Sequence, residues 1–240
     1  RSSDLRRVSV FGRHFSTRAR FLDSTGDFNF DSFLFATAHG QGQGPITRVI
    51  ATHMHPDHIG LAQWLCERWS TPTHECRLWI SATDYGVARL ASVSPTGFGG
   101  GEHSAAFYAQ HGLVNADYLA QIRARTNYFP SLVPSMPESY CRLMDGKLLQ
   151  IGGRSWRCIS GYGHAPEHMA LYCKALGVLI GGDMMLPRIS TNVSVYDADP
   201  DADPLGLYLS SLDRYLPLPD DALVLPSHGK PFTGMKLRID

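Results

Sequence analysis

The stretch Ile46–Gly60 reads ITRVIATHMHPDHIG. Its first part, Ile46–Ala51, is mostly apolar and β-branched, which predicts a short buried strand. Directly after it come four side chains able to bind a metal: His53, His55, Asp57 and His58. Apolar residues then recur at near-helical spacing from Ile59 to Trp69. The four side chains are therefore expected in a turn between a strand and a helix, at the edge where α/β folds usually bind ligands.

The spacing of these four side chains suits metal binding. On an extended chain His53 and His55 project to the same side, so both imidazoles can reach one ion. Pro56 forces a turn, which lets Asp57 and His58 face a second ion beside the first. Asp57 could instead serve only as a helix N-cap, and a single histidine is usually an ordinary core or surface residue. Three histidines and one aspartate between positions 53 and 58 favour the metal site over this reading.

The motif HxHxDH, here His53–His58, resembles the signature of the metallo-β-lactamase-fold hydrolases, and its surroundings resemble their glyoxalase II-like branch. This resemblance implies three further metal ligands: a histidine after a glycine-rich turn, an aspartate that ends a strand, and a late histidine. The candidates in chain order are His164, Asp183 and His228. His164 lies in the glycine-containing stretch Gly161–His168, and Asp183 follows the apolar run Val178–Ile180. His168 is expected to support the site rather than to bind the metal.

By this resemblance the ligands form two sets with one shared member. One ion would be held by His53, His55 and His164, the other by Asp57, His58 and His228, with Asp183 bridging both. These ligand types suit Zn²⁺ best, and iron or manganese also accept them. Two divalent ions about 3.5–4 Å apart can share a water, lower its pKa towards ~7 and so generate hydroxide. The chain is thus expected to be a metallo-hydrolase, in which Asp57 also orients the nucleophile.

Composition narrows the class of protein. The 240 residues include 22 basic and 22 acidic side chains, and 43% are hydrophobic. This length supports a sizeable core, and balanced charge argues against nucleic acid as a partner, since non-specific binding needs a strongly basic face. The five cysteines form no CxxC pair, which predicts reduced thiols. No segment has the length and hydrophobicity of a membrane span or a signal sequence. We therefore expect a cytoplasmic protein with a small-molecule substrate and no membrane partner; a homodimer stays open.

The second half of the chain predicts an antiparallel sheet followed by a helix and a last strand. Short runs separated by glycine-containing turns predict strands over Lys147–Ile151, Ser155–Ile159, Met169–Cys173 and Val178–Gly182. A helix is predicted over Asp203–Leu216, with one apolar face made of Leu205, Tyr208, Leu209, Leu212 and Leu216. A final buried strand is expected over Ala222–Leu225.

The first half is less regular. Arg77–Ser81 predicts a strand and Ala82–Ser92 a helix. Phe28–Ala38 is predicted to be the first helix, followed by the glycine-rich loop His39–Pro45. Phe21–Gly26 resembles the LVDTG element that precedes HxHxDH in the family, but less strand sequence stands before it than in other members. A weak apolar pattern over residues 5–11 predicts an edge strand.

The order of these elements, together with the resemblance, predicts an α/β (α+β) fold in one domain over residues 1–240. The expected architecture is a four-layer αββα metallo-β-lactamase sandwich, with two sheets face to face and helices outside. Residues 94–140 interrupt it with a loop and with helical pieces rich in aromatic side chains. Aromatic residues at helical spacing usually belong to a core, but long inserted segments near a site are often functional. We therefore expect a helical lid over residues 94–140.

An apolar lid favours an ester-like substrate with an apolar part, such as a thioester or a lactone. The segment Met185–Tyr196 follows the bridging aspartate and is expected to line the substrate pocket, with Arg188 and Tyr196 as candidate substrate-binding residues. Arg188 is as readily an ordinary exposed arginine.

Several relatives with the same motif are disfavoured. True β-lactamases lack the bridging aspartate of the family, and flavodiiron proteins carry glutamate where His55 stands. Two alternatives stay open. One is a mononuclear iron persulfide dioxygenase-like oxidoreductase, which leaves the second ligand set unused. The other is a phosphodiesterase or ribonuclease of the same fold, although the extra basic or β-CASP elements of such nucleases are absent from this chain.

Overall fold

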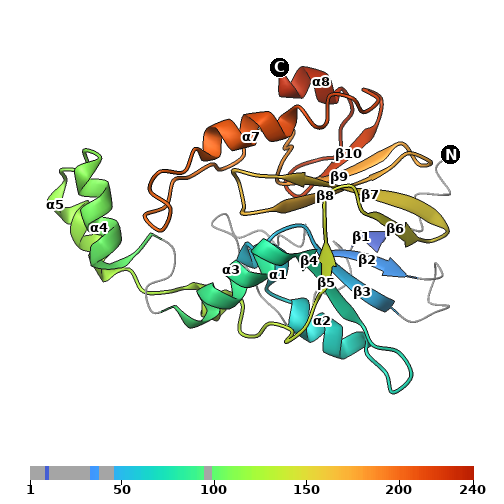
Figure 1. Ribbon diagram of the computed structural model, residues 1–240, viewed down its shortest axis with the longest axis horizontal. Coiled ribbons are helices and arrows are strands. Elements are labelled where there is room, and N and C mark those ends of the chain that lie inside the picture. Colours follow the sequence, from blue (N-terminus) through green and yellow to red (C-terminus); the bar gives the residue numbers. More distant parts are fainter. Residues whose placement is uncertain (1–8, 11–32, 38–45, 95–98) are drawn as a thin grey trace.

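In the part of the chain that the structure describes, two five-stranded sheets lie face to face, with helices on their outer sides (Figure 1). The computed structural model describes residues 9–10, 33–37, 46–94 and 99–240. A central apolar cluster that includes Ile50, Leu143 and Trp156 joins the two sheets. A second cluster lies between the first sheet and its helices, and a third between the second sheet and its helices. The predicted four-layer αββα sandwich is therefore confirmed.

The first sheet has the strand order β1-β2-β3-β4-β5. Its strands are β1 (Ser9–Val10), β2 (Phe33–Thr37), β3 (Ile46–Ala51), β4 (Arg77–Ser81) and β5 (Cys141–Leu143). The pairs β1–β2 and β2–β3 are antiparallel, whereas β3–β4 and β4–β5 are parallel. The strands predicted over 46–51 and 77–81 are confirmed with these bounds, and part of the edge strand predicted over 5–11 is present as β1.

The second sheet has the order β10-β9-β8-β7-β6. Its strands are β6 (Leu148–Ile151), β7 (Arg154–Gly161), β8 (His168–Cys173), β9 (Val178–Gly182) and β10 (Leu223–Pro226). The meander β6–β9 is antiparallel, as predicted, and β10 joins β9 in parallel. The helices α7 (Pro204–Leu212) and α8 (Met235–Ile239) lie along the outer side of this sheet (Figure 1).

One predicted helix is wrong. The stretch 28–38 was expected to be helical, but Phe33–Thr37 is strand β2, paired antiparallel with β3. A short apolar run has no periodicity that separates a strand from a buried helix turn, and pairing with the central strand decides the outcome here. Residues 11–32 and 38–45, which include the LVDTG-like element and the glycine-rich loop, lie outside the described residues.

The helix expected after the HxHxDH motif is interrupted. It consists of α1 (Pro56–Ile59) and α2 (Ala62–Trp69), separated at Gly60. A side chain at Gly60 would place its Cβ 2.7 Å from the carbonyl oxygen of Leu132 and equally close to that of Pro56. The backbone at Leu132 approaches so closely that only glycine fits at position 60. The next predicted helix is confirmed as α3 (Ala82–Val93).

Within the described residues of the segment 94–140 there are three short helices, α4 (Gly101–Gln110), α5 (Ala116–Ala124) and α6 (Phe129–Leu132). The first two pack against each other and stand apart from both sheets, at the left of Figure 1. In contrast, Phe129, Val133 and Met136 are buried in the apolar cluster beneath the first sheet. Only the α4–α5 pair thus has the shape of an appendage.

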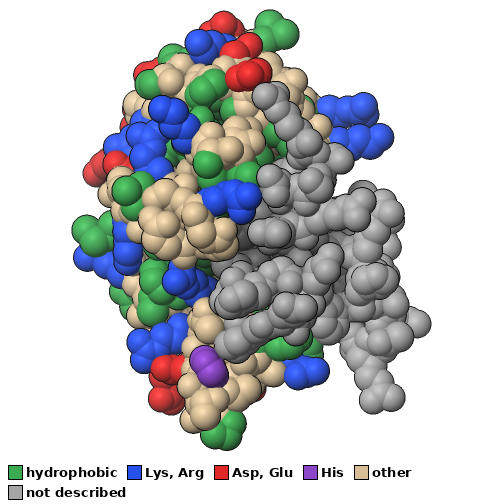
Figure 2. Space-filling view, turned by 90° about the vertical axis from the view of Figure 1, so that its right-hand side faces the viewer, with side chains coloured by type: hydrophobic (Ala, Val, Ile, Leu, Met, Phe, Trp, Pro, Cys, Tyr) green, Lys and Arg blue, Asp and Glu red, His purple; other side chains and the backbone are tan. Residues whose placement is uncertain are grey.

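The cysteines, the hydrophobicity of the helices and the charge of the surface were also the subject of predictions. All five cysteines are free, and four of them are buried. None of the helices within the described part of the chain has both the length and the hydrophobicity needed to cross a membrane. On the face seen in Figure 2, lysine and arginine side chains are interspersed with hydrophobic, neutral and acidic ones.

Candidate metal centre

The seven side chains expected to bind metal lie at neighbouring strand ends. The backbone N–H of Met169 in β8 donates to the carbonyl of Thr52 at 2.8 Å, which joins the end of β3 to the opposite sheet. The N–H of Ser227 donates to the carbonyl of Gly182 at 3.1 Å, which brings the end of β10 beside the end of β9. These contacts gather residues that are far apart in the sequence around one point.

The first group consists of three imidazoles whose nitrogens face one another. His53 Nε2 lies 2.9 Å from His55 Nδ1, and His164 Nε2 lies 3.1 Å from each of these two atoms. His53 is buried and the other two are largely so. This group is the set that the resemblance assigns to the first ion.

The second group consists of a carboxylate and two imidazoles. Asp57 Oδ2 lies 3.3 Å from His58 Nε2 and 3.5 Å from His228 Nε2. The side chain of Asp57 is 45% exposed, whereas that of His58 is fully buried. This group is the set that the resemblance assigns to the second ion.

Asp183 connects the two groups. Its Oδ2 lies 3.3 Å from His164 Nε2 in the first group and 3.5 Å from His228 Nε2 in the second. Its Oδ1 is buried and lies 3.5 Å from His58 Nε2. One carboxylate thus faces both groups, as a bridging ligand would.

The donor atoms fit a metal ion better than a network of hydrogen bonds. His164 Nδ1 lies 2.8 Å from the carbonyl oxygen of Asn192, which can only accept. In a neutral ring the proton is therefore on Nδ1, and the lone pair of Nε2 points into the cluster. In a tetrahedral zinc site with Zn–N bonds of 2.0–2.1 Å, neighbouring nitrogens lie about 3.3 Å apart. The 2.9–3.1 Å separations in the first group are close to this spacing.

The two groups differ in protonation. Burial lowers the pKa of His53 well below its ordinary value, and burial together with neighbouring His164 lowers the pKa of His55 to about 3. In the second group burial opposes protonation of His58, but hydrogen bonds with Asp183 and Asp57 outweigh it and raise its pKa to about 9. The same two carboxylates raise the pKa of His228 to about 10.

These pairs also hold the pKa values of Asp57 and Asp183 below their usual range, although burial opposes ionisation of both carboxylates. In the first group, His53 and His55 therefore offer neutral imidazoles. In the second group, His58 and His228 are protonated, and their protons lie where a metal ion would bind.

Asp84, which was not predicted from the sequence, binds the backbone of two loops that carry ligands, the loop of His53 and His55 and the loop of His164. Its Oδ1 accepts the backbone N–H of Met54 at 2.8 Å, and its Oδ2 accepts the backbone N–H of Glu167 at 2.6 Å and the hydroxyl of Ser81 at 3.0 Å. The carboxyl is fully buried, and burial raises its pKa to about 6. The spacing Ser81-x-x-Asp84 at a helix start is a capping pattern, which was the available signal.

Thr52 and His168 also contact the cluster without belonging to either group. The Thr52 hydroxyl lies 3.0 Å from His53 Nδ1 and 3.4 Å from His58 Nδ1, on the sides of the rings that face away from the cluster. His168 Nε2 accepts the backbone N–H of Asp183 at 3.2 Å, and burial lowers the pKa of His168 to about 3. A Cβ at Gly182, where φ is +54°, would lie 2.2 Å from this nitrogen. His168 therefore lies where the sequence placed it, beside the ligand set.

The predicted substrate residues lie outside the cluster. Arg188 is exposed. Tyr196 is half-buried, and burial raises its pKa, with the nearby rings of Tyr128 and Tyr108 contributing. In the segment 185–196, Thr191 and Asn192 contact the cluster through hydrogen bonds. The Thr191 hydroxyl donates to the carbonyl of Asp183 at 2.6 Å, and the carbonyl of Asn192 accepts from His164. Substrate binding by Arg188 and Tyr196 stays a prediction.

Comparison with known proteins identifies the family. The model of the metallo-beta-lactamase superfamily matches residues 17–228, which include all seven residues of the cluster. The chain belongs to the metallo-beta-lactamase superfamily.

Solved and curated members of the superfamily resemble the chain over part of their length. A beta-lactamase domain protein from Burkholderia ambifaria is 48% identical with a TM-score of 0.71, over 82% of this chain and 53% of that one. TTHA1623, solved in a di-iron-bound form, is 25% identical with a TM-score of 0.51, over 82% of this chain and 77% of that one. A probable metallo-hydrolase, YqjP of Bacillus subtilis (strain 168), is 33% identical over 93 residues, 37% of this chain and 28% of that protein.

The chain thus spans about half the length of the first of these structures and less than a third of the curated relative. Superfamily membership confirms the family-level prediction. Assignment to the glyoxalase II-like branch stays a prediction.

Proposed function

We propose that this chain is a dinuclear metal-dependent hydrolase that cleaves an ester-like bond, a thioester or lactone in the first instance. The observation that carries this proposal is the position of Asp183, whose carboxylate oxygens lie 3.3–3.5 Å from imidazole nitrogens of both the His53–His55–His164 group and the Asp57–His58–His228 group. His53, His55 and His164 would hold one divalent ion, and Asp57, His58 and His228 the other. When bound, the two ions would supply Lewis acidity and an activated water at neutral pH.

The chain's own residues would divide the remaining work. Asp57, whose side chain is 45% exposed against 8% for Asp183, is the carboxylate that an incoming water or substrate can reach. It would orient the nucleophile by accepting a hydrogen bond from it. The buried Asp183, braced by Thr191 and His168, would hold the two groups at a fixed separation.

Zinc is the favoured metal because imidazole and carboxylate ligands suit it. The di-iron form of TTHA1623, at 25% identity, supports iron as an alternative occupant of the same ligand set.

The substrate class rests on the apolar character of the segments that adjoin the cluster. Ile189 and Val195 are 59% and 38% exposed in the segment after Asp183, and Tyr128 is 52% exposed beside Tyr196. Exposed apolar side chains of this kind favour a substrate with an apolar part.

The α4–α5 pair would act as a lid. His103 of α4 lies 2.8 Å from the carboxylate of Asp197, in the chain that leads away from the cluster. Through this contact α4 and α5 would be held near the site.

The mononuclear dioxygenase alternative would leave the second group unused, so the number and identity of the bound metal ions separate it from a dinuclear hydrolase. A balanced overall charge argues against the ribonuclease alternative.

The test measures whether the zinc-loaded protein hydrolyses a decanoyl thioester, a ten-carbon lactone and an aryl phosphodiester. We expect turnover of the thioester or lactone to exceed that of the phosphodiester. We expect His55→Ala to lower it by at least about 100-fold, while His74→Ala, which replaces an exposed histidine outside the cluster, has no effect. Activity that survives His55→Ala, or oxygen uptake with a persulfide in place of hydrolysis, would refute the proposal.

A further inference from the structure

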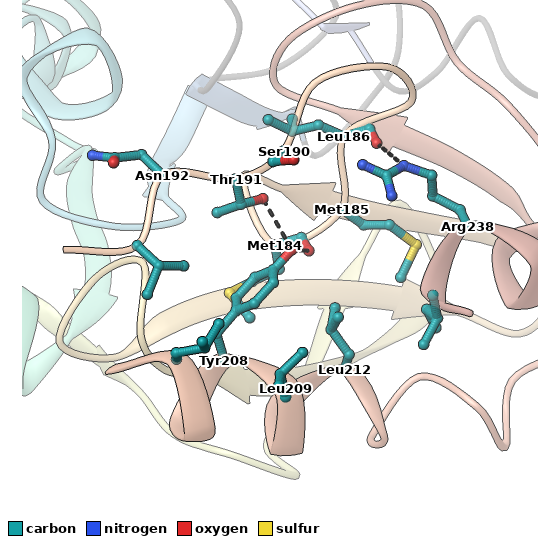
Figure 3. Close-up of a pocket in the computed structure, with 13 residues that line it drawn as sticks. Met184, Met185, Leu186, Ser190, Thr191, Asn192, Tyr208, Leu209, Leu212 and Arg238 are labelled. Atoms are coloured by element: carbon teal, nitrogen blue, oxygen red, sulfur yellow. Dashed lines mark hydrogen bonds between the residues drawn. The ribbon is translucent and has the colours of Figure 1, made fainter. Parts of the chain in front are cut away.

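A cavity of about 470 Å³ lies on the outer side of the second sheet, beneath the segment that follows Asp183 (Figure 3). Its walls are the segment 184–193, α7 and α8. Figure 3 shows Tyr208, Leu209 and Leu212 of α7 along one wall, with Thr191 and Met184 opposite. None of the seven residues of the metal cluster lines this cavity. Its volume lies within the range of small-molecule binding sites.

The apolar wall is formed by the apolar face that the sequence predicts for α7. Leu205, Tyr208, Leu209 and Leu212 stand at helical spacing and all line the cavity. Leu205 is 57% and Leu209 54% exposed, while Leu212 is buried. Met185 and Leu186 close the other side and are buried. An apolar helix stripe normally packs against protein, and here part of it borders open space instead.

The polar end of the cavity carries a positive charge. Arg238 in α8 donates through Nε to the carbonyl of Leu186 at 2.6 Å and through Nη2 to that of Ile189 at 2.9 Å. Both acceptors are neutral, and among the described residues no carboxylate forms an ion pair with the guanidinium. Ser190 and Asn192 add polar groups to the same segment.

We propose that this cavity binds an amphipathic carboxylate: an aliphatic chain of medium length with one anionic head. The chain would lie against the α7 leucines and the methionines, and the carboxylate would pair with Arg238. The apolar wall provides hydrophobic burial, and the guanidinium selects an anionic head over a neutral one. This binding site would exist whether or not the metal cluster hydrolyses esters.

Binding there would be coupled to the metal cluster through the shared wall. The Tyr208 hydroxyl lies 3.1 Å from the Thr191 hydroxyl, which donates to the carbonyl of Asp183, and Asn192 accepts from His164. A ligand that orders segment 184–193 therefore orders two predicted metal ligands as well. By linkage, zinc and the carboxylate would then each tighten the binding of the other.

The experiment is calorimetric titration of sodium decanoate, below its micellar concentration, into the metal-free and the zinc-loaded protein, with decanol as the neutral comparator. We expect one saturable site in both forms of the protein, with decanoate bound at least about tenfold more tightly than decanol. Leu209→Trp, which fills the cavity, should lower the affinity for decanoate by at least about tenfold. The matched control Leu207→Trp, on the same helix at a position 49% exposed and outside the cavity lining, should leave binding unchanged.

Four results would overturn the proposal. They are the absence of saturable binding, equal binding of decanol and decanoate, an equal effect of the two tryptophan variants, and binding seen only after zinc loading, which would place the ligand at the metal cluster. If the wild type is a dimer, Leu209→Trp is a monomer and decanoate does not bind, this face is an interface between two copies of the chain instead. Loss of hydrolysis by His55→Ala leaves the decanoate result unaffected, so this test and the test of the hydrolase are separate.

Discussion

The carboxylate of Asp84, fully buried in the first turn of α3, accepts the backbone N–H of Met54 at 2.8 Å. Met54 stands between His53 and His55, so this one hydrogen bond fixes the backbone that carries two of the predicted ligands. The other oxygen of Asp84 holds Glu167, in the loop of His164. Asp84 therefore couples two loops that bring ligands from opposite sheets.

Replacing Asp84 with asparagine should weaken metal binding. The amide nitrogen of asparagine cannot accept, so the backbone N–H of either Met54 or Glu167 loses its partner. Residues that orient metal ligands typically change affinity by about 10–100-fold when mutated, and we expect a loss of zinc affinity in that range. Competition with a chromophoric chelator measures it. Asp117→Asn is the matched control, because Asp117 stands in the first turn of α5 but is exposed; equal zinc affinity in both variants would contradict the role of Asp84.

Thr52→Val should have a smaller effect on the same affinity. The substitution keeps the shape of the side chain and removes the hydroxyl that lies 3.0 Å from His53 Nδ1 and 3.4 Å from His58 Nδ1. Both rings would lose a contact that orients them, one from each group. We expect zinc affinity to fall by about tenfold. Thr73→Val, at an exposed position in a turn, provides the control. A Thr52→Val protein with wild-type affinity for both ions would show that the rings are oriented by other contacts.

Zinc binding should release protons from the second group. In the metal-free protein the carboxylates of Asp183 and Asp57 raise the pKa of His58 to about 9 and that of His228 to about 10. Both rings are then charged at pH 7, and a metal ligand must be neutral. We expect about two protons per chain to be released at pH 7. Calorimetry in buffers of different ionisation enthalpy measures this number, and a binding enthalpy independent of the buffer would contradict the assignment of His58 and His228.

The same two pKa values predict how the stability of the metal-free protein depends on pH. Because both folded-state values lie above the ordinary histidine value of about 6.5, the ion pairs contribute fully below about pH 6.5 and are lost as the pH rises through about 9 to 10. The melting temperature of the metal-free protein should therefore fall over this upper range. In the zinc-loaded protein these histidines are neutral, so its melting temperature should fall less over the same pH range. Parallel curves for the two forms would be evidence against these ion pairs.

The sequence was most informative where the pattern is local. The strand β3 and the motif after it share one stretch of chain, and the resemblance supplied the positions of His164, Asp183 and His228. The structure brings these residues to the same point. Asp84 escaped prediction because its partners lie 30 and 83 residues away in the chain, and a capping pattern does not reveal distant backbone partners.

Two features of the fold depend on packing that the sequence does not show. Strand β2 was predicted as a helix, and the apolar face predicted for α7 borders a cavity along part of its length. In both cases the sequence reveals that a segment is apolar, whereas the neighbour that covers it, or fails to cover it, depends on tertiary packing.

The most direct test of the dinuclear site is the metal content of the zinc-loaded and dialysed protein, measured by mass spectrometry for the wild type, His55→Ala and His228→Ala. We predict about two ions per chain in the wild type and about one in each variant, since each substitution removes a ligand of a different ion. A chain that takes up no zinc, or one that holds a single ion unaffected by His228→Ala, would contradict a site in which the two groups bind two metal ions.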